Sequence, residues 1–164
     1  MYKKEEKTVD WLYELITNRF LITGVASWFV AQVLKTIIHA IINKKLVMER
    51  LFGDGGMPSG HSATVTALAT ISALTFGFNS FQFAVTALLA IIVCHDAMGV
   101  RLETGKQAQL INELTKAFEV WTKEDIPEIK LKEFVGHTPI QVIAGIILGV
   151  STGCVMHFWI FPMF

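Results

Sequence analysis

Long uncharged apolar stretches alternate with short charged ones along this chain of 164 residues. The stretch 20–42 has Lys35 and His39 as its only ionisable groups, and the stretch 62–94 has no charged residue and no histidine. A third apolar stretch runs from about 139 to 161. A membrane-spanning helix needs about 20 apolar residues. The pattern therefore predicts an all-α, polytopic membrane protein.

The stretch 62–94 is too long for one ordinary span, and Gly77-Phe78-Asn79-Ser80 offers a turn in its middle. We predict a tight hairpin of two short helices, 62–77 and 81–97. Each would measure about 24–27 Å at a rise of 1.5 Å per residue. Together with the flanking stretches, they make a bundle of about four transmembrane helices.

Amphipathic segments flank this bundle, within a single integral membrane domain of residues 1–164. Residues 1–19 form an N-terminal interfacial segment, because Trp11, Leu12, Leu15 and Ile16 share one helical face. The alternative for this segment is a solvated tail. Residues 99–136 contain an amphipathic helix over 101–121, followed by a charged loop. We expect this helix to lie on the membrane surface or over the site.

Composition supports the membrane assignment and removes other classes. Apolar residues make up 52% of the chain and charged residues 17%, with zero formal net charge. This balance is typical of integral membrane proteins and leaves no basic footprint for nucleic acid. Cys94 and Cys154 lie in apolar stretches and indicate buried thiols rather than a disulfide framework or a zinc site. The charged start of the chain lacks the apolar core of a cleaved signal peptide.

If the four helices alternate in direction, separated polar groups meet at one side of the membrane. His61 begins the second helix, Asp96 closes the third, and His137 precedes the fourth. Lys35 lies toward the matching end of the first helix, on a face that it shares with Gln32, His39 and Asn43. In the last helix, Gly145, Gly149 and Gly153 continue the face of His137 and allow close helix contact.

The converging groups suit a phosphate ester. Cations and the backbone N–H groups of the glycine-rich stretch Gly55–Ala63 would hold an anion at a helix N-terminus. One histidine would attack phosphorus and the other would protonate the leaving oxygen. Two alternatives stay open: Lys35 extends to the interface only for solvation, or both histidines and Asp96 form a metal triad.

Four motifs resemble a known family. Pro58-Ser59-Gly60-His61 and Gly136-His137-Thr138-Pro139 are similar to motifs of the type 2 phosphatidic acid phosphatase superfamily, which includes vanadium haloperoxidases. With Ala31-Gln32-x-x-Lys35 and Asp96-Ala-x-Gly-Val-Arg101, the set resembles the small divergent branch found in bacteria and plants. The resemblance covers about residues 20–150. It implies a phosphohistidine at His137, a general acid at His61, and phosphate contacts from Lys35, Ser59 and Gly60.

The chain departs from the superfamily pattern at two site positions. The superfamily arginine falls at Leu131, and the aspartate that orients the nucleophilic histidine is Gln141. We expect Gln141 to accept a hydrogen bond from the ring and to belong to the substrate site. As a hypothesis, Asp96 supplies the missing carboxylate and Arg101 the missing guanidinium. The alternative is that these two pair with each other. Gln107 either reaches a headgroup or faces water.

We therefore predict a membrane phosphatase that hydrolyses a lipid phosphomonoester or pyrophosphate without a metal or cofactor. Its alternatives are a non-catalytic lipid-phosphate binding or transport protein and, less fittingly for so short a chain, a vanadate-binding peroxidase. The expected partners are a phospholipid or isoprenoid-phosphate substrate and membrane lipids, with homo-oligomer formation left open. Excess Lys and Arg near the motifs favour cytoplasmic motif loops in a bacterial plasma membrane.

Overall fold

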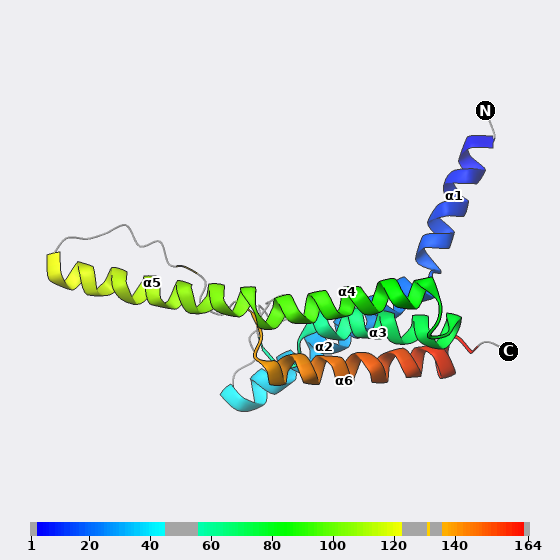
Figure 1. Cartoon of the computed structure of the whole chain (residues 1–164). Coiled ribbons are helices and arrows are strands. Elements are labelled where there is room, and N and C mark those ends of the chain that lie inside the picture. The colour runs from blue at the N-terminus through cyan, green and yellow to red at the C-terminus, as the bar shows by residue number, and fades with distance from the viewer. Residues whose placement is uncertain (1–2, 45–55, 123–130, 132–135, 163–164) are drawn as a thin grey trace.

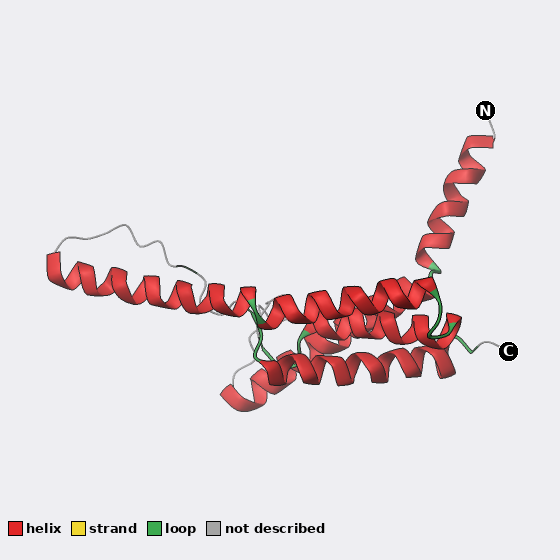
Figure 2. Cartoon of the chain, viewed as in Figure 1, coloured by secondary structure: helices red, strands yellow, loops and turns green. Residues whose placement is uncertain are grey.

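The computed structural model describes residues 3–44, 56–122, 131 and 136–162, and all regular structure among them is helical (Figure 2). Side chains are described for 10–44, 56–100 and 102–122, and for 131 and 136–162. Four helices pack side by side in one bundle, with α3 contacting each of the other three (Figure 1). They are α2 (Arg19–Asn43), α3 (Gly60–Phe76), α4 (Phe81–Met98) and α6 (Pro139–Val155).

The predicted hairpin between α3 and α4 is confirmed. Helix α3 ends at Phe76, and Gly77 adopts a positive φ of 84°, which favours glycine. The Ser80 hydroxyl donates to the Gly77 carbonyl at 2.7 Å and also accepts from the Phe83 N–H at 3.2 Å. Ser80 therefore closes the turn and caps α4 with one side chain.

The interior of the bundle is built from small residues, whereas large apolar side chains face outward. A methyl group added to Gly145, Gly149 or Gly153 would lie 2.5–2.7 Å from the nearest atom of α3 or its N-cap residue Ser59. The exposed large side chains of α4 and α6 include Leu88, Ile91, Ile92, Ile143 and Ile147. Close backbone contact inside and an apolar exterior are the arrangement expected of helices that associate in lipid.

Three helices are long and apolar enough to cross a membrane by length and composition, fewer than the four we predicted. They are α2, α6 with its continuation η2 (Met156–Ile160), and the combined α4 and α5. Helix α3 has the predicted apolar character but only 17 residues, about 25 Å of helix. It is the central helix, flanked by the others.

The amphipathic segments are helical as predicted, but α5 (Val100–Thr122) does not fold back over the bundle. It continues along α4 and projects beyond the bundle end (Figure 1). Gly99, with φ −97° and ψ −100°, is the one residue between the two helices. Its N–H donates to the His95 carbonyl at 2.9 Å at the end of α4, and its carbonyl accepts from the Glu103 N–H at 3.1 Å at the start of α5. Helix α1 (Lys3–Ile16) stands at an angle at the opposite end.

Candidate active site

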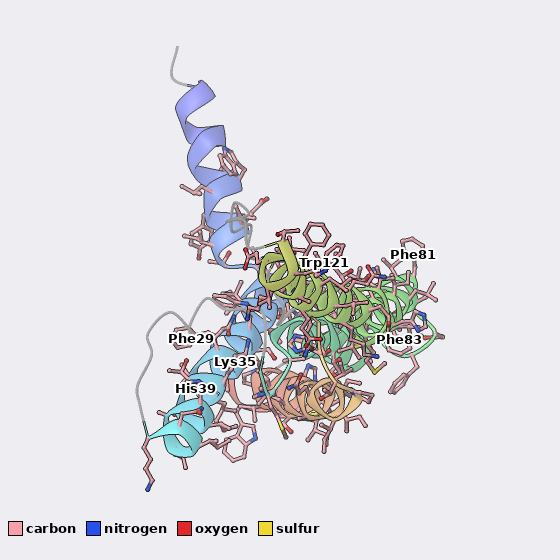
Figure 3. All side chains as sticks on the ribbon, turned by 90° about the vertical axis from the view of Figure 1, so that its left-hand side faces the viewer. Phe29, Lys35, His39, Phe81, Phe83 and Trp121 are labelled. Atoms are coloured by element: carbon pink, nitrogen blue, oxygen red, sulfur yellow. The ribbon has the colours of Figure 1, made fainter. Side chains whose placement is uncertain are left out.

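The polar ends of four helices meet at one end of the bundle. The C-terminal ends of α2 and α4 and the N-terminal ends of α3 and α6 lie there, while both chain termini lie at the other end (Figure 1). Figure 3 looks along the bundle from this end and labels Lys35 and His39 on α2. The alternating helix directions expected from the sequence are therefore present in the bundle.

His61 and His137 come together at this end. Their ring centroids lie 6.2 Å apart, with the ring planes inclined by 59°. His137 is 2% exposed, whereas His61 is exposed at the second position of α3. The His137 backbone N–H donates to the Ala97 carbonyl at 3.0 Å, which fixes the residue against the end of α4. One buried and one exposed imidazole thus lie next to each other at this end of the bundle.

Gln141 sets the orientation of the His137 ring. Its Oε1 atom lies 3.3 Å from His137 Nδ1 and accepts from the Thr138 backbone N–H at 3.0 Å. Because a backbone N–H can only donate, this amide atom is the oxygen, and Nδ1 must carry the hydrogen. The lone pair of the neutral ring then resides on Nε2, the atom that a nucleophilic role requires. Gln141 thus positions the histidine as expected, and its contact with substrate remains a prediction.

The Pro-Ser-Gly-His stretch starts α3 against α6. Ser59 is the N-cap: its hydroxyl accepts from the Ser62 N–H at 3.3 Å and the Ser62 hydroxyl at 3.0 Å. Its backbone N–H donates to the Gln141 carbonyl at 3.0 Å. Gly60 is the first residue of the helix, so its N–H has no intrahelical acceptor. Pro58 directly precedes the N-cap. The contact of Ser59 with phosphate remains a prediction.

Lys35 brings a cation into the same end of the bundle. It is 4% exposed, and a methyl group on Gly56 would lie 3.0 Å from its Cγ and 3.3 Å from its Cδ. Gly56 has a φ of 104°, so the backbone there both turns and passes close to the lysine stem. A buried ammonium is costly unless acceptors or anions surround it. The backbone at Gly56 and the stem of Lys35 therefore pack directly against each other.

The remaining predicted site residues, Asp96, Arg101 and Gln107, lie on α4 and α5. Asp96 is half-buried on α4, directly before Ala97, whose carbonyl accepts from His137. Arg101 lies in α5, but its side chain is outside the described part of the structure. Gln107 is exposed on α5, about 10 Å along the helix from its start. The roles of all three remain predictions.

The metal triad considered from the sequence does not form. Among the described residues, no group of three His, Cys, Asp or Glu side chains could hold a metal ion. His61, His137 and Asp96 belong to the residues searched.

Two features of the site were not predicted from the sequence. The Ala97 carbonyl that holds His137 carries no signal in its residue type. Trp28 and Gln32 both stand against Gly60: a methyl group there would lie 3.5 Å from Trp28 Cδ1 and 3.9 Å from Gln32 Nε2. The spacing of four residues between Trp28 and Gln32 on α2 could have indicated the shared face.

Comparison with known proteins gives the family. A family model described as "Divergent PAP2 family" matches residues 16–152. The chain is 41% identical over 155 residues to a protein named "Uncharacterized membrane protein YuiD" from Bacillus subtilis (strain 168), covering 89% of this chain and 98% of the relative. No solved structure matches the chain. With its apolar spans and this relative, the chain is an integral membrane protein, and it belongs to the Divergent PAP2 family.

Proposed function

We propose that the protein is a membrane phosphatase that hydrolyses a lipid phosphomonoester or pyrophosphate through a phosphohistidine at His137. The observation that carries the proposal is the 6.2 Å separation of the His61 and His137 rings beside the start of α3. Membership of a PAP2-related family supports a phosphatase-like role, and the buried Lys35 supports an anionic substrate.

The mechanism transfers the phosphoryl group twice. His137 Nε2 forms a bond to phosphorus while the bond to the leaving oxygen breaks, and His61 donates its proton to that oxygen. Water then forms the new bond to phosphorus, the N–P bond breaks, and His61 recovers a proton from the water. Lys35 and the N–H groups at the start of α3 stabilise the charge on the equatorial oxygens in both steps.

A lipid substrate fits the position of the site at the end of the apolar bundle. We propose that α3 is a fourth, short span, so that the site lies at one membrane boundary, with the motif loops in the cytoplasm. A phospholipid or isoprenoid phosphate could keep its chain among the lipids while its phosphate reaches the histidines. No metal or cofactor is required by this mechanism.

The test is phosphate release by the full chain in detergent, with phosphatidate and a polyisoprenyl diphosphate as substrates. His137→Ala should abolish release, whereas the matched control His157→Ala should not, because His157 lies in η2 at the other end of the bundle. Release that is equal in both variants would contradict the proposal.

A second function is a lipid-phosphate binding or transport protein with the same anion pocket. The observation that favours it is Gln141, because a neutral amide orients the ring but stabilises an imidazolium less than a carboxylate does. Binding of the same lipids to the wild type, lost in Lys35→Met and accompanied by no phosphate release, would support this function instead.

A further inference from the structure

Gln32 is a buried polar side chain to which the mechanism above gives no role. It lies on α2, between Trp28 and Lys35, and is 6% exposed. Its Nε2 atom would lie 3.9 Å from a methyl group on Gly60, the residue directly before His61. Its Oε1 atom is enclosed and, within the described part of the chain, accepts no hydrogen bond.

An enclosed acceptor without a donor destabilises the fold. An apolar residue of similar size would avoid this cost, so packing among the described residues does not by itself explain a carboxamide at this position. The terminal torsion of glutamine is broad and roughly two-fold. A half-turn would exchange the two amide atoms and bring the oxygen to the side of Gly60. A donor that arrives beside Gly60 would satisfy it.

Gln32 lies on α2, whereas His137 lies just before α6, on another side of the start of α3. On the α6 side, Gly145 lies against Ser59 and Ser62, while on the α2 side Gln32 lies against Gly60. In an in-line transfer, the nucleophile and the leaving group occupy opposite sides of phosphorus, and the hydrolytic water later enters where the leaving group left. That side belongs to His61 in the proposed mechanism, and Gln32 is next to the residue that precedes His61.

We propose that Gln32 is a positioning residue that orients the water which hydrolyses the phosphohistidine. The inference rests on the proposed function. One O–H of the water donates to His61 Nε2 or Nδ1 and the other to Gln32 Oε1, which directs an oxygen lone pair at phosphorus. As the O–P bond forms and the N–P bond breaks, His61 takes the first proton and the second stays on the released phosphate.

The experiment separates formation of the phosphohistidine from its hydrolysis. The full chain in detergent is mixed rapidly with ³²P-labelled phosphatidate, quenched in alkali, and assayed for label on protein and for free phosphate. Gln32→Leu should label at the wild-type rate, release phosphate about tenfold more slowly, and accumulate labelled protein. Gln32→Glu, which keeps an acceptor oxygen, should accumulate less label than Gln32→Leu.

Each outcome decides between the possibilities. Suppose that the wild type is labelled. If Gln32→Leu then slows labelling and hydrolysis by the same factor, or slows neither of them, the inference is wrong while the proposed function stands. If the wild type releases phosphate but carries no protein label that disappears in His137→Ala, the phosphohistidine mechanism itself fails. Gln32→Met serves as a second apolar variant, and its agreement with Gln32→Leu would exclude a local packing defect.

Discussion

The His137 ring lies 6.2 Å from the His61 ring, and the backbones that carry them are joined where Ser59, just before α3, donates its N–H to the carbonyl of Gln141 at 3.0 Å, just inside α6. This bond joins the two helix starts that carry the histidines. The relationship of the rings is therefore a property of the bundle end rather than of either side chain alone, and each of the predictions below perturbs one part of it.

Replacing Gln141 should reduce turnover while preserving the fold. Gln141→Ala removes the oxygen that accepts from His137 Nδ1, so the ring loses its orientation, and we expect kcat to fall by about tenfold to a hundredfold. Gln141→Glu keeps an acceptor and adds the charge that stabilises an imidazolium, so it should retain more activity than Gln141→Ala. Equal losses in the two variants, measured by phosphate release, would argue against a role in ring orientation.

Removing the buried cation should weaken anion binding more than stability. Lys35→Met keeps the stem that packs on Gly56 but loses the ammonium, so we expect about a tenfold or larger loss of affinity for vanadate. The thermal unfolding midpoint is measured in parallel, so that a loss of affinity is distinguished from a loss of folded protein. Lys44→Met, on the exposed C-cap of α2, is the matched control and should change neither quantity.

A methyl group on the glycine face of α6 should separate it from α3. In Gly149→Ala the new carbon would lie 2.5 Å from the Ala63 carbonyl oxygen, and a backbone atom cannot move aside as a side-chain end can. We expect destabilisation of about 1–3 kcal/mol, despite the helix preference for alanine. Thermal unfolding in detergent measures the change. Ile147→Ala, on the exposed face of the same helix, should have a smaller effect.

Asp96→Asn tests whether a carboxylate near His137 supports catalysis. If Asp96 supplies the charge that Gln141 lacks, turnover should fall by about a hundredfold or more while the thermal unfolding midpoint changes little. Unchanged turnover would instead support the alternative that Asp96 pairs with Arg101 at the end of α4. Combining Asp96→Asn with Gln141→Glu is informative, because a restored carboxylate at position 141 should recover part of the lost activity.

Helix bounds and the convergence of the motifs could be predicted because they depend on local pattern. The predicted helices 62–77 and 81–97 correspond to Gly60–Phe76 and Phe81–Met98, since glycine and serine mark the turn between them. The meeting of His61 and His137 followed from alternating helix directions alone. The glycine spacing on α6 likewise identified the face that packs closely.

Other features depend on tertiary contacts that no local pattern encodes. The bond from His137 to the Ala97 carbonyl involves a backbone atom that every residue type carries. The direction of α5 depends on the backbone conformation of Gly99, and glycine permits many conformations. Ser59 was predicted to contact phosphate, but whether a serine near a helix start caps it or binds a ligand depends on the position of the first turn.

The close contact of α3 with α6 also determines where the chain can change during evolution. Because the two histidines sit at the starts of helices whose backbones touch, their separation does not depend on how long the connecting loops are. Insertions and deletions between helices should therefore be tolerated in relatives, whereas a single added carbon at Gly145 would shift the geometry of the reacting groups. Sequence divergence should accumulate on the lipid-facing surface and in the loops, whereas the interface between α3 and α6 should accept almost no substitution.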